Sequence, residues 1–128
     1  DVREPIIDVD DIADVAVAAL TEDRHAGALY EVTGPRLMSF AEMADALSAA
    51  LGRPIRHLPI TFDEFHASVA RAGGADVADV FTAIAKETLD GRNAQVTDGV
   101  HRALGRPARD FADFAAAAAK AGAWSAAA

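Results

Sequence analysis

The chain has 128 residues, of which 52% are hydrophobic, and it contains no cysteine. That length suits one domain, and the lack of cysteine excludes a disulfide framework, a thiolate nucleophile and a cysteine-ligated zinc site. The net charge of −8 arises within residues 1–50, where eleven acidic residues face three arginines, and this excess of negative charge opposes binding to nucleic acid.

The same composition bears on localisation and on packing. No apolar run approaches the roughly 20 residues of a membrane-spanning helix, and no signal peptide is recognisable. With the lack of cysteine, this predicts a cytoplasmic protein without a membrane partner. The first methionine is Met38, so we expect a trimmed or truncated product. Alanine supplies much of the hydrophobic fraction, which predicts closely packed helices with small contact faces.

The run EPIIDV, residues 4–9, predicts a short apolar strand. Asp10 or Asp11 is then expected to cap a helix, because a carboxylate accepts first-turn N–H groups and favours the positive end of the helix dipole. The apolar periodicity of that helix predicts a buried face made of Ile12, Val15, Ala16, Ala19 and Leu20. In the polar loop that follows, we expect His25 to be solvated.

The run ALYEVT, residues 28–33, predicts a second strand, which Gly34–Pro35 ends. Ser39 and Glu42 have the spacing of a capping box, in which each side chain bonds the backbone N–H of the other residue. The helix that begins there is expected to bury Phe40, Met43, Leu47 and Leu51.

The sequence ALGRP occurs at residues 50–54 and again at residues 103–107. The flanking residues differ, so both copies are interpreted as helix ends, with glycine in the left-handed conformation and proline preventing continuation. Residues 55–60 alternate in polarity and predict a short edge strand. Thr61 and Glu64 form a second capping box, and the remaining residues predict helices.

Two apolar strands separated by a helix form one βαβ unit, and a parallel sheet seldom has only two strands. Such a unit leaves an edge unpaired. The expected completion is another part of the protein, a second copy of the chain, or helices that cover the edges.

The segment PIIDVDDIADVAVAALTEDRHAGALYEVTGP, followed by SFAEMADALSAALGRPI, resembles the C-terminal part of NmrA-like proteins, which are atypical short-chain dehydrogenase/reductases. The ending DGRNAQVTDGVHRALGRPARDFADFAAAAAKAGAW is also similar to that family's ending. The resemblance implies a mostly helical α/β fold in one structural domain. Residues 1–60 would be the last strands of a Rossmann-like parallel sheet, and residues 61–128 a helical substrate-side region.

The resemblance further implies an oxidoreductase that moves a hydride between NAD(P) and a small carbonyl or quinone-like compound. In that family the N-terminal half binds the dinucleotide. This sequence has no G-x-G-x-x-G between a strand and a helix and no Tyr-x-x-x-Lys. We therefore expect NAD(P) in a full-length protein, no cofactor binding or activity by this chain alone, and the nucleotide-binding half or a second copy as its partner.

A substrate site is also implied. The candidate substrate-binding residues are Pro5, Ile6, Thr33, Gly34, Pro35, Phe62, Phe65 and His66. The resemblance places the first two and both phenylalanines at the substrate cavity, although core packing would also explain the phenylalanines. The Thr-Gly-Pro run lies at the end of a predicted strand, where open α/β sheets bind ligands, although a plain turn would also explain it. No residue is assigned a catalytic, cofactor-binding or metal-binding role.

The histidines and the first aspartates have alternative interpretations. A histidine beside carboxylates can act as a general base or metal ligand, which makes His57 and His66 candidates, whereas His101 is expected at the surface. Three aspartates at residues 8, 10 and 11 carry the oxygen ligands that Mg²⁺ or Ca²⁺ prefers. Helix capping explains them without an ion.

Two other classes of function stay open. Some NmrA-like proteins sense NAD(P) and bind a protein partner without turning over substrate, so the chain could belong to a non-catalytic regulator. It could instead be a free-standing homodimeric module that binds a ligand or a protein and pairs its exposed strand edges.

Overall fold

The computed structural model describes residues 2–124. Within them the elements are β1 (Arg3–Glu4), α1 (Val9–Thr21), the 3₁₀ turn η1 (Asp23–His25), β2 (Met38–Ser39), α2 (Phe40–Leu51), α3 (Phe62–Gly73), α4 (Ala75–Thr88), α5 (Gly99–Leu104) and α6 (Phe111–Lys120). The fold is therefore mostly helical, as predicted. None of the described helices is both long enough and apolar enough to cross a membrane.

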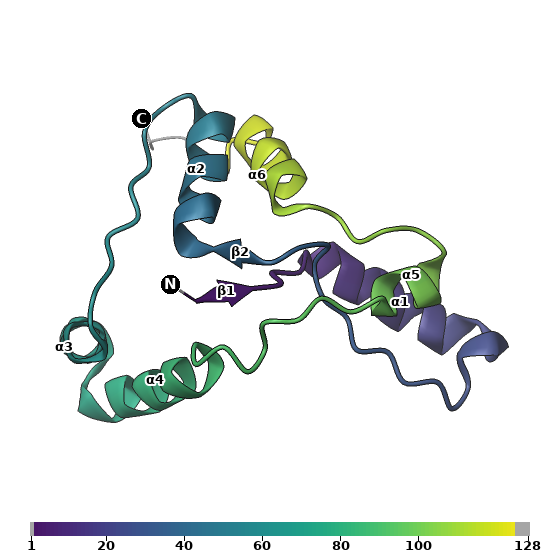
Figure 1. Ribbon diagram of the computed structural model, residues 1–128, viewed down its shortest axis with the longest axis horizontal. Helices are drawn as coiled ribbons and strands as arrows, with labels where there is room; N and C mark the ends of the chain where they lie inside the picture. The colour runs from purple at the N-terminus through teal and green to yellow at the C-terminus, as the bar shows by residue number, and fades with distance from the viewer. Residues whose placement is uncertain (1, 125–128) are drawn as a thin grey trace.

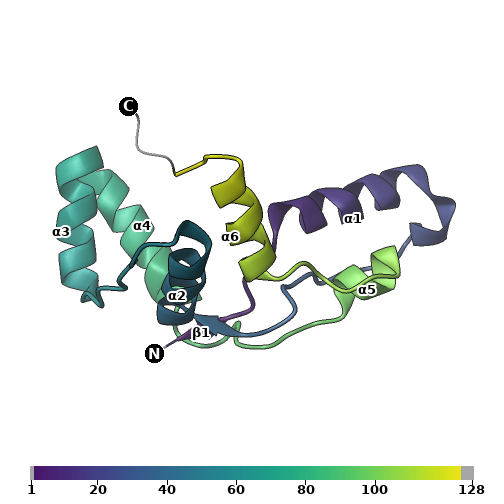
Figure 2. The same ribbon diagram turned by 90° about the horizontal axis from the view of Figure 1, so that it is seen from above.

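The helices pack as three pairs. α3 packs on α4, α2 on α6, and α1 on α5. Figure 1 shows the three pairs lying apart, joined by long irregular segments that cross in the middle of the molecule. In Figure 2, the α3–α4 pair and the α1–α5 pair lie at opposite ends, with α2 and α6 between them. Because the last two pairs join elements far apart in the sequence, the chain is closed by contacts between its two ends and not by a central sheet.

Local capping determines where several helices begin and end. In the first predicted capping box, the Ser39 hydroxyl accepts from the Glu42 N–H at 3.2 Å and the Glu42 carboxylate accepts from the Ser39 N–H at 2.8 Å. Thr61 and Glu64 form the same pair of bonds at 3.2 and 2.7 Å. The glycine of each ALGRP copy has φ of 63° or 70° and ends a helix. Both boxes and both helix ends are confirmed.

Residues 28–33 and 55–60 form no strand, and of residues 4–9 only Glu4 lies in one, so the three predicted strands are wrong apart from that residue. The only strands among residues 2–124 are β1 and β2, which pair antiparallel, so the predicted parallel sheet is also absent from the described chain. One backbone bond joins the first two segments, from the Gly34 N–H to the Pro5 carbonyl at 2.9 Å. A strand needs a ladder of such bonds, and these segments have no neighbour in the described chain that supplies one.

Helix α1 buries only part of its predicted face, since of the five residues only Val15 is buried. It begins at Val9 and is capped by Asp8, whose carboxylate accepts the Asp10 N–H, so neither Asp10 nor Asp11 is the cap. Its buried residues are Asp11, Val15 and Ala18. Ile12 and Leu20, both predicted to be buried, are 45% and 87% exposed. The apolar side of this helix faces away from the rest of the described chain.

Helix α2 also buries less of its predicted face than expected. Ala44 is its buried residue, Phe40 is 43% exposed, and the other three predicted contacts are only half-buried. Among the described residues the largest fully buried side chains are Val100 and Asp11. Small contact faces are thus confirmed, and most large apolar side chains stay near the surface.

The accessible surface of the chain is larger than that of a typical folded monomer of the same mass. It amounts to 8516 Å², whereas a folded monomer of 13.3 kDa exposes about 6,500 Å². The difference of about 2,000 Å² is contributed in part by exposed large apolar residues. Those on α1 and α4 are Val9, Ile12, Val17, Leu20, Val77, Val80, Phe81 and Ile84.

A buried ion pair fastens α1 to the segment between α5 and α6. Asp11 is fully buried, and its Oδ1 lies 2.7 Å from Arg106 Nη1. Its Oδ2 accepts the Arg109 backbone N–H at 2.7 Å, and the Arg109 guanidinium also donates to this carboxylate. Asp14 Oδ2 accepts from the same two arginines at 2.6 and 3.0 Å.

This network contributes to the acid response of the fold. Burial raises the pKa of Asp11, but the Arg109 N–H and the two guanidinium groups outweigh burial and hold its pKa below the ordinary value of 3.8. A carboxyl whose folded-state pKa is lowered stabilises the fold above its unfolded pKa. That contribution is lost as the pH falls through the folded-state value.

We predict that Asp11→Asn lowers the free energy of unfolding by about 3 kcal/mol at neutral pH, because it removes the buried carboxylate that pairs with Arg106 and Arg109 and leaves them only the more exposed Asp14. Urea unfolding measures this loss. Asp10→Asn, at an exposed position of the same turn, is the control and should have little effect. The difference between wild type and Asp11→Asn should shrink below about pH 3.8. Equal losses in the two variants would contradict the prediction.

Candidate functional site

Three irregular segments meet in the middle of the molecule and form one wall. The Thr33 hydroxyl accepts the Thr97 backbone N–H at 2.9 Å, and the Thr97 hydroxyl donates to the Glu31 carbonyl at 2.6 Å. The Gly34 N–H donates to Pro5, as described above. Threonine hydroxyls therefore join residues 31–34 to residues 97–99, and the backbone bond from Gly34 joins residues 31–34 to residues 5–7, without a sheet ladder.

Two glycines allow these segments to come so close. A Cβ added at Gly34 would lie 1.8 Å from the Ile6 carbonyl oxygen, and one added at Gly99 would lie 1.9 Å from the Glu31 carbonyl oxygen. Real Cβ atoms do not approach backbone at these distances, so any larger residue would push the segments apart.

The wall forms one side of an open hollow of about 430 Å³. Its lining residues are Glu4, Pro5, Ile6, Ile7, Glu31, Val32, Thr33, Asn93 and Gln95. Glu4 Oε1 is buried without a hydrogen-bond partner in the described chain. Asn93 and Gln95 bring amide groups that can donate to a carbonyl oxygen. Apolar walls with a few converging polar groups are typical of small-molecule sites.

The structure brings together four of the eight candidate substrate-binding residues. Pro5, Ile6 and Thr33 line the hollow, and Gly34 lies in its wall. Pro35 is exposed in the turn and does not line it. The other candidates lie at the α3–α4 pair: Phe62 and Phe65 line a separate hollow of about 280 Å³, and His66 lines a third.

The histidines lie in surroundings that the sequence predicts only in part. His66 Nε2 lies 2.8 Å from Asp79 Oδ1 on α4, so its partner is across the helix pair and not in its own first turn. His57 stacks on Phe40, with ring centroids 6.1 Å apart. His25 was expected to be solvated, which is wrong, because it is 4% exposed and its Nδ1 lies 2.8 Å from the Tyr30 hydroxyl. His101 is exposed, as predicted.

Three contributors to the hollow were missed in the sequence. Asn93, Gln95 and Thr97 lie in a polar loop before α5 and match no motif. The one weak signal was Gly99, since glycine at the start of a helix can mark a close backbone approach. Among residues 2–124, no group of three or more His, Cys, Asp or Glu side chains could hold a metal ion.

Several known reductases are similar to this chain in sequence or in fold. No protein-family model matches the chain. It is 44% identical over 112 residues to the NAD(P)H azoreductase of Xenophilus azovorans, and 38% identical over 110 residues to the (4-alkanoyl-5-oxo-2,5-dihydrofuran-3-yl)methyl phosphate reductase of Streptomyces griseus. These alignments cover 87% and 86% of this chain but 39% of each relative. The chain therefore spans about two fifths of the length of the curated relatives it matches.

Solved structures share the fold over nearly all of this chain. The triphenylmethane reductase of Citrobacter sp. matches with a TM-score of 0.77 and 22% identity, covering 93% of this chain and 42% of its own. An NADPH-dependent quinone oxidoreductase of Escherichia coli matches with a TM-score of 0.72 and 19% identity, covering 91% of this chain and 43% of its own.

We predict that Gly34→Ala lowers the free energy of unfolding by about 3 kcal/mol, because its Cβ would collide with the backbone of the neighbouring segment. Thermal or urea unfolding measures the loss. Gly73→Ala is the control, because its Cβ would meet only the side chain of Val77, at 3.2 Å, and alanine favours the helix. If the two variants are equally stable, the three segments do not lie as closely as described.

Proposed function

We propose that the chain forms the substrate-binding side of an NAD(P)-dependent reductase, because it is homologous to the C-terminal part of the NmrA-like, atypical short-chain dehydrogenase/reductases. The proposed substrate is a small carbonyl or quinone-like compound. The observation that carries the proposal is the 44% identity to an NAD(P)H azoreductase across 87% of the chain.

The hollow suits a compound of that class. The carbonyl oxygen of a substrate can accept hydrogen bonds from the amides of Asn93 and Gln95. The side chains of Ile6, Ile7 and Val32 offer an apolar surface to the ring of a quinone-like substrate. NAD(P)H would supply the hydride. This chain's residues would bind the acceptor and exclude water from it.

The nucleotide-binding half is proposed to pack on this chain. The exposed surface beyond that of a typical monomer is about 2,000 Å², which is the area that one partner buries in a large obligate interface. The apolar side of α1, which contains Ile12 and Leu20, lies in this surface. Within the described chain, no backbone hydrogen bond is donated by the N–H groups of residues 29–33, so that segment offers an edge to a neighbouring strand.

We predict that this chain alone does not turn over NADPH with a quinone. Joined to the part of the Xenophilus azovorans azoreductase that precedes the matched segment, it should restore quinone-dependent or azo-dye-dependent NADPH oxidation. Absorbance of NADPH follows both reactions, and the nucleotide-binding part without this chain is the control. Micromolar NADPH binding with turnover by this chain alone would refute the division of roles.

We predict that Leu20→Lys weakens association with that separately produced nucleotide-binding part by at least tenfold, because it places a charge on the apolar side of α1. Lysine suits the C-terminal end of a helix, so the fold should be unaffected. Leu58→Lys is the control, since Leu58 is 75% exposed beside the α3–α4 pair. Sedimentation of mixtures measures both. Equal weakening by the two variants would exclude docking through α1.

A further inference from the structure

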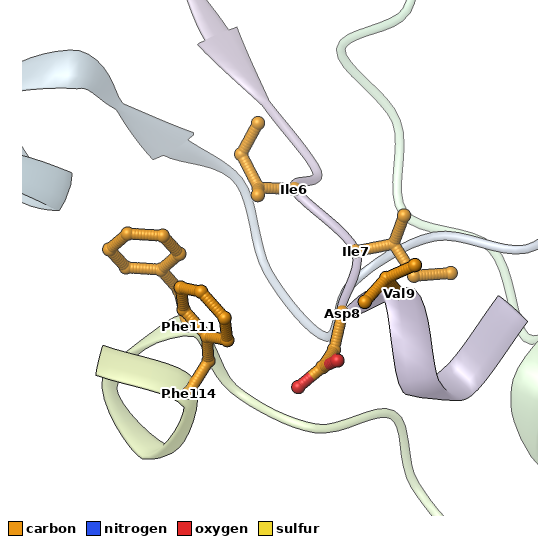
Figure 3. Close-up of a pocket in the computed structure, with 6 residues that line it drawn as sticks. All are labelled: Ile6, Ile7, Asp8, Val9, Phe111 and Phe114. Atoms are coloured by element: carbon orange, nitrogen blue, oxygen red, sulfur yellow. The ribbon is translucent and has the colours of Figure 1, made fainter. Parts of the chain in front are cut away.

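A second, smaller hollow lies between the segment leading into α1 and the first turns of α6. Its volume is about 210 Å³, and its lining residues are Ile6, Ile7, Asp8, Val9, Phe111 and Phe114. Figure 3 shows two phenyl rings on one side, isoleucine side chains on the other, and one carboxylate at the edge, directed to the side on which the rings lie. All the other lining side chains are apolar.

The aromatic side of this hollow is open enough to meet a ligand. The rings of Phe111 and Phe114 lie 5.8 Å apart at 40°, and Trp124 meets Phe114 edge-on at 6.2 Å. Phe114 and Trp124 keep 39% and 37% of their surface exposed. Flat rings gain from stacking or edge contacts with such a wall. Because a cavity of about 150 Å³ accommodates benzene, this hollow has room for one ring with a short substituent.

The single polar group of the hollow selects the charge of the ligand. Asp8 Oδ1 accepts the Asp10 N–H at 2.9 Å, and no hydrogen bond within the described chain involves its Oδ2. The surface next to it also carries Asp10 and Asp113. The only cation on that surface is Arg109, whose guanidinium already binds Asp11 and Asp14. The side-chain charge beside the hollow is therefore negative, although the N-terminal end of α1 offsets part of the Asp8 charge, and this balance favours a cation over an anion.

We propose that this hollow binds an aromatic cation of one ring. The ring lies between Ile6 and the two phenylalanines, and the positive group lies at the Asp8 carboxylate. The phenyl faces add to the attraction for a nearby cation. Binding here involves no NAD(P), so it does not depend on the proposed reductase activity.

Three probes of similar size test the charge preference: phenethylammonium, 2-phenylethanol and 3-phenylpropionate. Each is titrated into the chain, with binding followed by calorimetry and by the fluorescence of Trp124, the single tryptophan. The ammonium compound should bind most tightly, about fivefold better than the neutral alcohol, and the carboxylate should bind least. Added salt should reduce the preference for the ammonium compound and leave binding of the neutral alcohol unchanged.

Asp8→Asn separates the ligand contact from the helix cap, because asparagine caps a helix as well as aspartate does. It should reduce ammonium binding about fivefold and leave alcohol binding unchanged. Asp76→Asn removes the same charge from the first turn of α4 and should change neither. The proposal is overturned if the ammonium compound fails to bind at millimolar concentration, if all three probes bind equally, or if Asp8→Asn does not alter the preference.

Discussion

The buried carboxylate of Asp11 is the constraint on which the rest of the structure depends. Because no fully buried side chain in the described chain is larger than valine, apolar burial alone holds the ends of the chain weakly. Two arginines before α6 bind this carboxylate, and Asp110, which caps α6, is bound in turn by Arg36 at 2.6 and 3.0 Å. These ion pairs bring α1, α6 and the segment after residue 34 to one place.

The site follows from that closure. The segments that lead into α1, out of α1 and into α5 cross beside it, and Gly34 and Gly99 allow the crossing at backbone contact. The hollow formed there has a wall on this chain and an open side. The same openness leaves the apolar side of α1 and the unpaired N–H groups of residues 29–33 at the surface. The proposed docking of a nucleotide-binding half would account for both the open hollow and the exposed helix face.

Features that depend on a few neighbouring residues were predictable from the sequence. Ser39 with Glu42, Thr61 with Glu64 and the two ALGRP helix ends were correct, because a cap is satisfied within one turn. Features that depend on distant partners were not. Residues 4–9 and 28–33 have strand-like composition but no ladder, and the apolar face of α1 has no partner in the described chain. The division at residue 60 and the substrate roles of the eight candidates stay predictions.

Amide hydrogen exchange of residues 28–34 and of α1 tests the central claim most directly. It is measured on this chain alone and again in the presence of a nucleotide-binding half from the azoreductase relative. Alone, the N–H groups of residues 29–33 should exchange almost without protection, since they have no backbone partner. On association they and the exposed side of α1 should become protected. Protection already present in the isolated chain, or none gained on mixing, would contradict the account.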